Sequence, residues 1–85
     1  MSYRLVYTQK AVRDIARLDA AVKKRLGATL IRFTDNPLQY AERLTNSELG
    51  GYRFRIGDYR VIFDMEGKDI VVLRVGHRKE IYKRK

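Results

Sequence analysis

Residues 52–63 of this chain read Tyr52-Arg53-Phe54-Arg55-Ile56-Gly57-Asp58-Tyr59-Arg60-Val61-Ile62-Phe63. Apolar and basic residues alternate with period two on either side of Gly57-Asp58, which is typical of two strands that each have one solvated face. Glycine enters positive φ without steric cost, so Gly57-Asp58 predicts a two-residue hairpin turn. Such a turn sets Ile56 opposite Tyr59 and Arg55 opposite Arg60.

This pairing divides the predicted hairpin into an apolar face and a basic face. The apolar face would hold Tyr52, Phe54, Ile56, Tyr59, Val61 and Phe63. The basic face, called the basic platform below, would hold Arg53, Arg55 and Arg60. Like charges directly across a strand pair destabilise it by up to about 1 kcal/mol. Three arginines on one small surface therefore predict an anionic ligand.

The rest of the composition agrees with an anionic partner. The 85 residues carry a net charge of +9, which favours nucleic acid, an acidic protein or a membrane surface as partner. The alternative is a basic domain without such a partner. A chain of this length predicts one domain with a shallow groove rather than a large enclosed cavity.

Several function classes are excluded by what the sequence lacks. There is no cysteine and only one histidine, so disulfides, thiolate metal sites and most histidine-based metal sites are excluded. No nucleotide-binding motif occurs, and the longest aliphatic run, residues 70–73, is far too short to span a membrane. The N-terminus lacks the apolar stretch of a signal peptide. We therefore expect a cytoplasmic protein without cofactor or metal.

The first half of the chain predicts one strand and a helical hairpin. Residues 3–7 alternate as a strand, and Thr8 and Asp19 can each cap a helix. The second helix should end before Asn36-Pro37, because the residue before proline is pushed out of the helical region. The expected apolar stripes are Val12, Ile15 and Ala16 in the first helix, and Val22, Leu26, Leu30 and Phe33 in the second. Residues 38–51 show no sustained period and predict a loop or a ragged helical turn.

A second turn near Gly67 and a last strand over residues 70–77 complete the sheet. A three-residue loop, Glu66-Gly67-Lys68, buries the larger apolar set, and Gly67 takes a left-handed position in it. The resulting pairs are Phe63 with Val71, Val61 with Leu73, and Arg60 with Arg74. Arg74 would then join the basic platform.

These elements predict one α+β domain over residues 1–85 in the order β-α-α-β-β-β. A helical hairpin packs on one face of a small, mainly antiparallel four-stranded sheet, and the arginines occupy the other face. The tail from residue 78 to residue 85 is basic and is expected to form about one helical turn.

Two blocks of the chain resemble the RelE branch of the RelE/ParE toxins. They are residues 51–63 and the run Val72-Leu73-Arg74-Val75-Gly76-His77-Arg78-Lys79-Glu80-Ile81-Tyr82. Val12-Arg13-Asp14-Ile15 and Asn36-Pro37 also fit, so the resemblance covers nearly the whole length. It implies a ribonuclease-like fold and the toxin of a type II toxin–antitoxin pair. It also implies a metal-independent endoribonuclease that cuts mRNA in the ribosomal A site and inhibits translation. The implied partners are an acidic, RelB-like antitoxin, the ribosome and mRNA.

The resemblance also implies a site. The family's catalytic positions map to Arg53, Arg55, Arg60, Arg78 and Tyr82. Further RNA contacts are expected from Arg43, Arg74, Lys79 and Lys83. Metal-free cleavage uses the RNA 2′-hydroxyl as nucleophile, and guanidinium groups can stabilise the dianionic phosphorane that forms.

The general base is the open question of this site. Some family members carry lysines at the positions of Arg53 and Arg55, and arginine cannot give up its proton as lysine can. Tyr82 is the candidate, because surrounding cations would favour its phenolate form. Strict alternation places His77 on the Val75 face, away from the arginines, which predicts a structural histidine. Tyr52, Phe54 and Tyr59 are predicted to lie in the core rather than to stack on bases.

Two other functions stay open at this point. A ParE-like gyrase poison would bind a topoisomerase without cutting RNA. The segment His77-Arg78-Lys79-Glu80-Ile81-Tyr82 argues against it, because ParE-type chains generally lack the terminal tyrosine. A basic RNA-binding module without activity is the third reading.

Overall fold

The fold is an α+β unit whose sheet has five strands in the order β1-β5-β4-β3-β2. The computed structural model describes residues 2–45 and 48–82. β1 runs parallel to β5, and the other neighbouring strands are antiparallel. The strands are β1 (Arg4–Tyr7), β2 (Ala41–Arg43), β3 (Tyr52–Ile56), β4 (Tyr59–Glu66) and β5 (Asp69–His77). The helices are α1 (Gln9–Ala16), α2 (Ala20–Phe33) and the single turn α3 (Pro37–Tyr40).

The strand that sequence analysis missed is β2. Residues 41–43 were expected in a loop, and the prediction of four strands was wrong. β2 pairs antiparallel with β3 and places Glu42 opposite Arg53. A strand of three residues is too short to show an alternating pattern, so pairing with β3 rather than local sequence defines it.

The first hairpin has the predicted register. Arg55 lies opposite Arg60, and Phe54 lies opposite Val61. Gly57 has φ 60°, as the two-residue turn requires. The buried side chains of its apolar face are Phe54, Ile56, Val61 and Phe63.

The second hairpin differs from the prediction. Glu66 pairs with Asp69, so the loop is the two residues Gly67-Lys68 and not three. Phe63 lies opposite Val72, and a β-bulge then shifts the register so that Ile62 faces Arg74. Arg60 consequently lies opposite Gly76. The three-residue loop was predicted on the assumption that side chains alternate strictly along the last strand. A bulge adds one residue to that strand, so both Val72 and Val75 reach the core with a two-residue loop. Gly67 does have positive φ, as predicted.

The helices begin where their capping residues predicted. The Thr8 hydroxyl accepts a hydrogen bond from the Ala11 N–H and donates one to the Leu73 carbonyl. α1 therefore continues along the edge of β5 beyond the point where β1 ends. Only a narrow side of α1 reaches the core, so Ala11 is buried while Val12 is 55% exposed, contrary to the predicted stripe. In α2 the predicted Leu26, Leu30 and Phe33 are buried.

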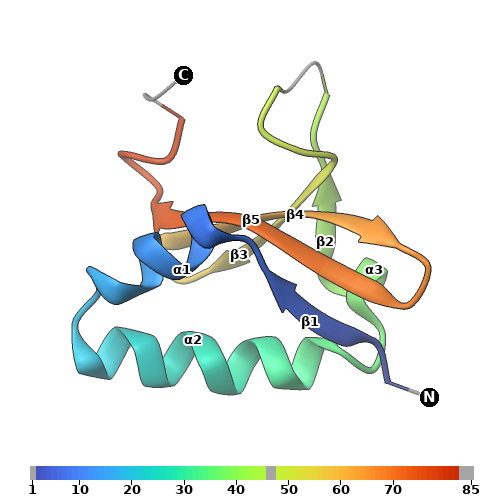
Figure 1. Ribbon diagram of the computed structural model, residues 1–85, viewed down its shortest axis with the longest axis horizontal. Coiled ribbons are helices and arrows are strands. Elements are labelled where there is room, and N and C mark those ends of the chain that lie inside the picture. The colour runs from blue at the N-terminus through green and yellow to red at the C-terminus, as the bar shows by residue number, and fades with distance from the viewer. Residues whose placement is uncertain (1, 46–47, 83–85) are drawn as a thin grey trace.

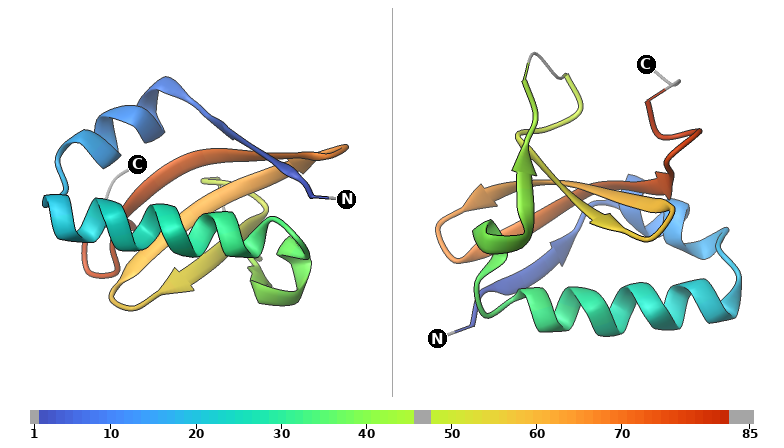
Figure 2. Two further views of the ribbon diagram at one scale, coloured as in Figure 1. Left: turned by 90° about the horizontal axis from the view of Figure 1, so that it is seen from below. Right: turned by 180° about the vertical axis from the view of Figure 1, so that it is seen from behind.

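The layers place the basic platform on the outer side of the sheet. α2 crosses one face, and the core lies between α2 and the strands (Figures 1 and 2). The described parts of the β2–β3 connection and the tail both rise from the opposite side (Figure 1). Nowhere in residues 2–45 and 48–82 is there a helix long and apolar enough to span a membrane.

Candidate functional site

Arg53 is the arginine of the basic platform that contacts both β2 and the tail. It projects from β3 on the side opposite to the buried Phe54. Its Nε donates to Oε1 of Glu42 at 2.7 Å, and its Nη1 donates to the Tyr82 hydroxyl at 2.7 Å. The hydrogen bonds to Tyr82 and to Glu42 raise the pKa of Arg53 above its ordinary value. The Arg53 guanidinium is thus held between Glu42 of β2 and Tyr82 of the tail.

Glu42 joins the two arginines of β3. Its Oε2 accepts from Nη1 of Arg55 at 3.3 Å, while Oε1 accepts from Arg53. These contacts, with Arg53 the larger cause, hold the pKa of Glu42 below its ordinary range. The Arg55 side chain is 56% exposed and offers most of its donors to solvent. Sequence analysis did not include Glu42, because the only signal for it was a single acidic residue in a segment without periodicity.

Arg60 lies deeper than its two neighbours. The residue is 7% exposed, and Nη1 donates to the carbonyls of Gly57 at 3.0 Å and Tyr59 at 2.9 Å. The side chain folds back over its own turn and braces it. The structure therefore brings Arg53 and Arg55 together at the surface, whereas Arg60 is buried against the carbonyls of its turn.

The tail is fixed beside the platform by Ile81. The Ile81 side chain is buried and packs on Gly76. A Cβ added at Gly76 would lie 3.1 Å from Cδ1 of Ile81. The Ile81 N–H donates to the His77 carbonyl, which closes one helical turn. Tyr82 follows at once, is 43% exposed and reaches Arg53.

Arg78 connects the tail to the first hairpin. Its backbone N–H donates to the Asp58 carbonyl at 2.7 Å, and its Nε lies 3.4 Å from the Asp58 carboxylate. The Arg78 side chain is about half exposed. Arg78 and Tyr82 therefore belong to the same segment, but Arg78 contacts the turn between β3 and β4, whereas Tyr82 contacts β3.

The expected RNA contacts occupy different surroundings. Arg43 is exposed at the end of β2, and Lys79 is exposed in the tail. Arg74 instead makes two hydrogen bonds to Asp14 of α1, at 2.8 and 3.1 Å. Lys83 lies outside the described residues.

The aromatic and histidine predictions are confirmed by their positions. Phe54 is buried, and Tyr52 and Tyr59 pack against the core. The His77 and Tyr59 rings meet edge to face, with their centroids 5.4 Å apart. Nδ1 of His77 accepts a hydrogen bond from the Lys79 N–H. His77 therefore lies on the apolar side of the sheet.

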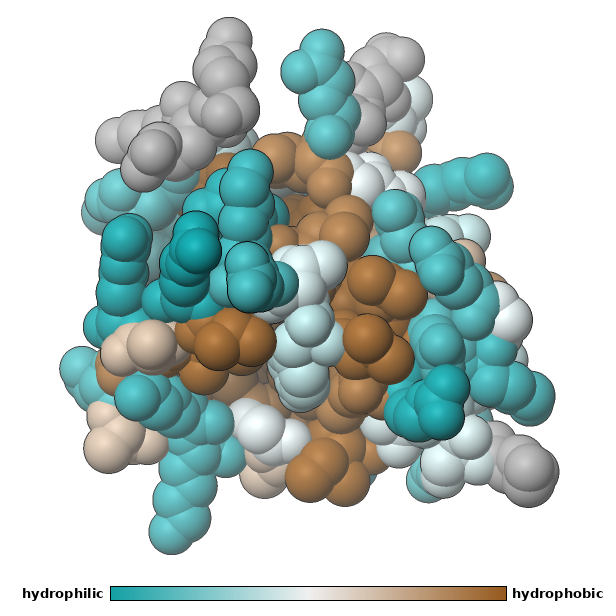
Figure 3. All heavy atoms as spheres, viewed as in Figure 1, coloured by the Kyte–Doolittle hydropathy of each residue, from teal (hydrophilic) through white to brown (hydrophobic). Residues whose placement is uncertain are grey.

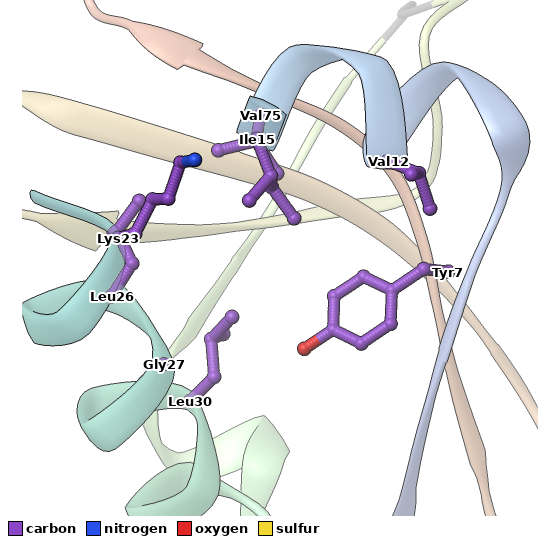
Figure 4. A pocket seen from close by; sticks show the side chains of 8 residues that line it. All are labelled: Tyr7, Val12, Ile15, Lys23, Leu26, Gly27, Leu30 and Val75. Carbon is purple, nitrogen blue, oxygen red and sulfur yellow. The ribbon is translucent and has the colours of Figure 1, made fainter. Parts of the chain in front are cut away.

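A hollow opens between α1, α2 and β1, and its lining differs chemically from the basic platform. It encloses about 300 Å³ and is lined by Tyr7, Val12, Ile15, Lys23, Leu26, Gly27, Leu30 and Val75 (Figure 4). The Tyr7 ring is directed toward α2, and burial raises the pKa of its hydroxyl (Figure 4). Apolar side chains gather near the centre of this face of the molecule, between hydrophilic flanks (Figure 3). Its lining is almost entirely hydrocarbon, so the groups suited to phosphate chemistry lie on the basic platform instead.

Comparison with known proteins identifies the family of this chain. The family model described as ParE toxin of type II toxin-antitoxin system, parDE, matches residues 5–82. The chain is 32% identical to Toxin RelG of Mycobacterium tuberculosis, with 99% of this chain and 100% of RelG covered. It is 25% identical to Toxin RelE3 of Methanocaldococcus jannaschii, over 93% of this chain and 94% of RelE3. The chain therefore belongs to the RelE/ParE toxin superfamily and is a RelE-family toxin of the type II toxin–antitoxin systems.

A solved structure agrees with this assignment. The fold matches the toxin–antitoxin complex RelBE2 of Mycobacterium tuberculosis with a TM-score of 0.83 at 25% identity. The match covers 92% of this chain and 100% of that one. The predicted RelE-like, α+β fold is confirmed, with five strands in place of four.

Proposed function

We propose that this toxin is a ribosome-dependent mRNA endoribonuclease that cleaves mRNA in the A site and so inhibits translation. The observation that carries the proposal is a set of linked side chains on the exposed side of the sheet. Arg53 donates a hydrogen bond to Tyr82, and Glu42 joins Arg53 to Arg55. Guanidinium donors beside a phenolic hydroxyl can bind a phosphate and move a proton at the same surface. RNA supplies the nucleophile, so no cofactor or metal is needed.

The arginines have distinct roles in this proposal. Arg55 is the most exposed of the three on the platform and binds the non-bridging oxygens of the scissile phosphate. Arg53 stabilises the charge that develops and holds Tyr82 in place. Arg60 supports the turn that carries Asp58, to which Arg78 is attached. Arg43, Lys79 and Lys83 attract the RNA backbone. Arg74 contributes to the structure of the site, because its contact with Asp14 joins β5 to α1.

An antitoxin partner follows from the relatives. The Mycobacterium tuberculosis match was solved as a complex of toxin and antitoxin. A chain of net charge +9 with an exposed arginine surface favours a partner that is acidic and partly disordered before it binds. We propose a RelB-like antitoxin that neutralises the basic platform, and a cytoplasmic location where ribosomes are available.

Toeprinting on translated mRNA tests the activity. Purified protein added to programmed ribosomes should produce reverse-transcription stops within the A-site codon, and Tyr82→Phe should reduce them. A DNA supercoiling assay with gyrase addresses the second candidate, which is favoured only by the ParE description of the matching family model. Trapped gyrase cleavage complexes without mRNA stops would replace the proposed function with gyrase poisoning.

A further inference from the structure

The proposed reaction requires a group that accepts the proton of the 2′-hydroxyl. Arginine cannot serve, because its pKa lies above about 12 and it stays protonated. Within the part of the chain that the structure describes, two other ionisable side chains contact Arg53 directly, namely Glu42 and Tyr82. They lie against different nitrogens of one guanidinium, Glu42 at Nε and Tyr82 at Nη1.

The hydrogen bond from Arg53 determines whether the Tyr82 hydroxyl can donate a proton or accept one. Arg53 Nη1–H donates to the Tyr82 oxygen, so the O–H of Tyr82 remains available as a donor. The guanidinium carbon also lies 5.8 Å from the centre of the tyrosine ring. A phenol that accepts from a cation can give up its proton and leave a stabilised phenolate. This geometry suits a proton donor.

Glu42 has the complementary geometry. Both of its carboxylate oxygens face arginine donors, and its side chain is 41% exposed, so it can be reached from the outer face of the sheet. The groups that face it are Arg53 and Arg55 of β3, with Tyr82 beyond Arg53. The arginines keep its pKa low, so Glu42 is ionised at neutral pH, which is the form that a general base requires.

We propose that Glu42 is the general base of the cleavage reaction and Tyr82 its general acid. This proposal rests on the proposed function. A Glu42 oxygen takes the proton of the 2′-hydroxyl while the 2′-oxygen forms a bond to phosphorus. The bond from phosphorus to the 5′-oxygen breaks, and the Tyr82 hydroxyl gives its proton to that oxygen. The products are a 2′,3′-cyclic phosphate and a 5′-hydroxyl, with one proton moved to Glu42 and one lost from Tyr82.

Substrate binding increases the basicity of Glu42. Its contact with Arg55 is the longer of the two, 3.3 Å against 2.7 Å for Arg53, and Arg55 is the more exposed arginine. A phosphate that engages Arg55 draws that guanidinium away from the carboxylate. Glu42 then loses one of the two cations that suppress its basicity at the moment when a proton must be accepted.

Single-turnover cleavage on programmed ribosomes tests this assignment. Glu42→Gln keeps an oxygen that can accept from Arg53 but loses the negative charge and the ability to take a proton, so its rate should fall about 10²–10⁴-fold. Glu42→Asp should recover part of that loss. Glu66→Gln, an exposed glutamate at the far end of β4, is the matched control and should cleave like wild type. Thermal melts confirm that each variant is folded.

An mRNA with sulfur in place of the 5′-oxygen at the cleaved linkage separates the two roles. A thiolate leaves without protonation, so Tyr82→Phe should regain a rate close to wild type on this substrate, while Glu42→Gln should remain slow. A Glu42→Gln variant within about threefold of wild type on normal mRNA would overturn the proposal, as would recovery of Glu42→Gln rather than Tyr82→Phe on the sulfur substrate. If wild-type protein cleaves neither mRNA, the proposed function itself fails.

Discussion

Asp14 holds Arg74 through both carboxylate oxygens and accepts the Val75 N–H with one of them. The carboxylate thus secures α1 to the stretch of β5 that β1 does not cover. Asp14 and Arg74 side chains are only 11% and 24% exposed, which makes this the most shielded ion pair among the described residues. A pair in such a position is structural in the first place.

Asp14→Ala should therefore destabilise the fold. The substitution leaves a shielded guanidinium and a backbone N–H without their acceptor, a loss of about 2–4 kcal/mol. The melting temperature should fall by about 4–8 °C for each kcal/mol in a domain of this size. Calorimetry of Asp14→Ala beside Glu66→Ala measures it, and equal melting temperatures would contradict the structural role.

Arg55→Ala and Arg60→Ala should separate function from stability. Arg55 is exposed, so its removal should lower cleavage at least about tenfold and shift the unfolding free energy by less than about 0.5 kcal/mol. Arg60 supplies two hydrogen bonds to carbonyls of its turn, and its removal should cost about 1–3 kcal/mol. Denaturant unfolding and cleavage rates on the same samples give both numbers. Loss of stability in Arg55→Ala but not in Arg60→Ala would contradict this division.

Gly27→Ala should stabilise the protein. Gly27 lies inside α2, and a Cβ built there meets no atom within 4 Å. Alanine in a helix interior is favoured over glycine by about 0.8–1 kcal/mol, so the melting temperature should rise. Gly57→Ala is the contrasting variant, because φ is +60° there and the added Cβ would lie 2.5 Å from Nη2 of Arg25. A lower melting temperature in Gly27→Ala would mean that the hollow beside α2 closes on this position.

The Glu42 carboxylate should titrate at lower pH than an isolated glutamate. The arginines lower its pKa in the folded state, so their contact with Glu42 favours folding at neutral pH. That contribution is present above the ordinary glutamate pKa of about 4.3 and is lost as the pH falls through the lower, folded value. Carbon NMR of the Glu42 carboxyl, with Glu66 as internal reference, follows this directly. Arg53→Met should move the Glu42 midpoint upward; an unchanged midpoint would mean that the ion pair does not form in solution.

An acidic antitoxin should change the protection of the tail. The Glu80 and Ile81 amides both donate to the His77 carbonyl in the free toxin. An antitoxin that covers or displaces the segment from Arg78 onward should slow or speed hydrogen exchange at these two amides. Co-expression with a candidate acidic antitoxin, followed by size-exclusion chromatography, supplies the complex. Failure of any acidic protein to co-purify would remove the main support for the antitoxin proposal.

Sequence analysis located the platform because a two-residue turn fixes side-chain parity over the whole hairpin. Strand alternation places Arg53 and Arg55 on one side and Phe54 and Ile56 on the other, and the Gly57-Asp58 turn sets Arg55 opposite Arg60. The bulge opposite Ile62 could not be foreseen in this way, since alternation assumes that no residue is added to a strand. It changed the partner of Arg60 and directed Arg74 to Asp14.

The contribution of Glu42 depended on an interaction distant in sequence. Nothing in Ala41-Glu42-Arg43 shows a period, and the pairing that brings Glu42 to Arg53 closes a connection of about ten residues. The burial of Ile62 on the platform side has a similar cause. Gly50 passes so close above it that a Cβ at Gly50 would lie 2.9 Å from Ile62. Contacts of this kind follow from the path of the connection, which the local pattern does not specify.

The order of the strands in the sheet also determines how late in synthesis the sheet can be completed. β5 lies between β1 and β4, and Arg4 of β1 meets Asp69 of β5 across a separation of 65 residues. A nascent chain that has reached residue 66 already contains β1, both long helices, β3 and β4 but lacks the strand that unites them. Ile81, which anchors Tyr82 beside Arg53, emerges later still. The surface proposed to attack ribosome-bound mRNA therefore cannot assemble until the ribosome has synthesised the chain through Tyr82.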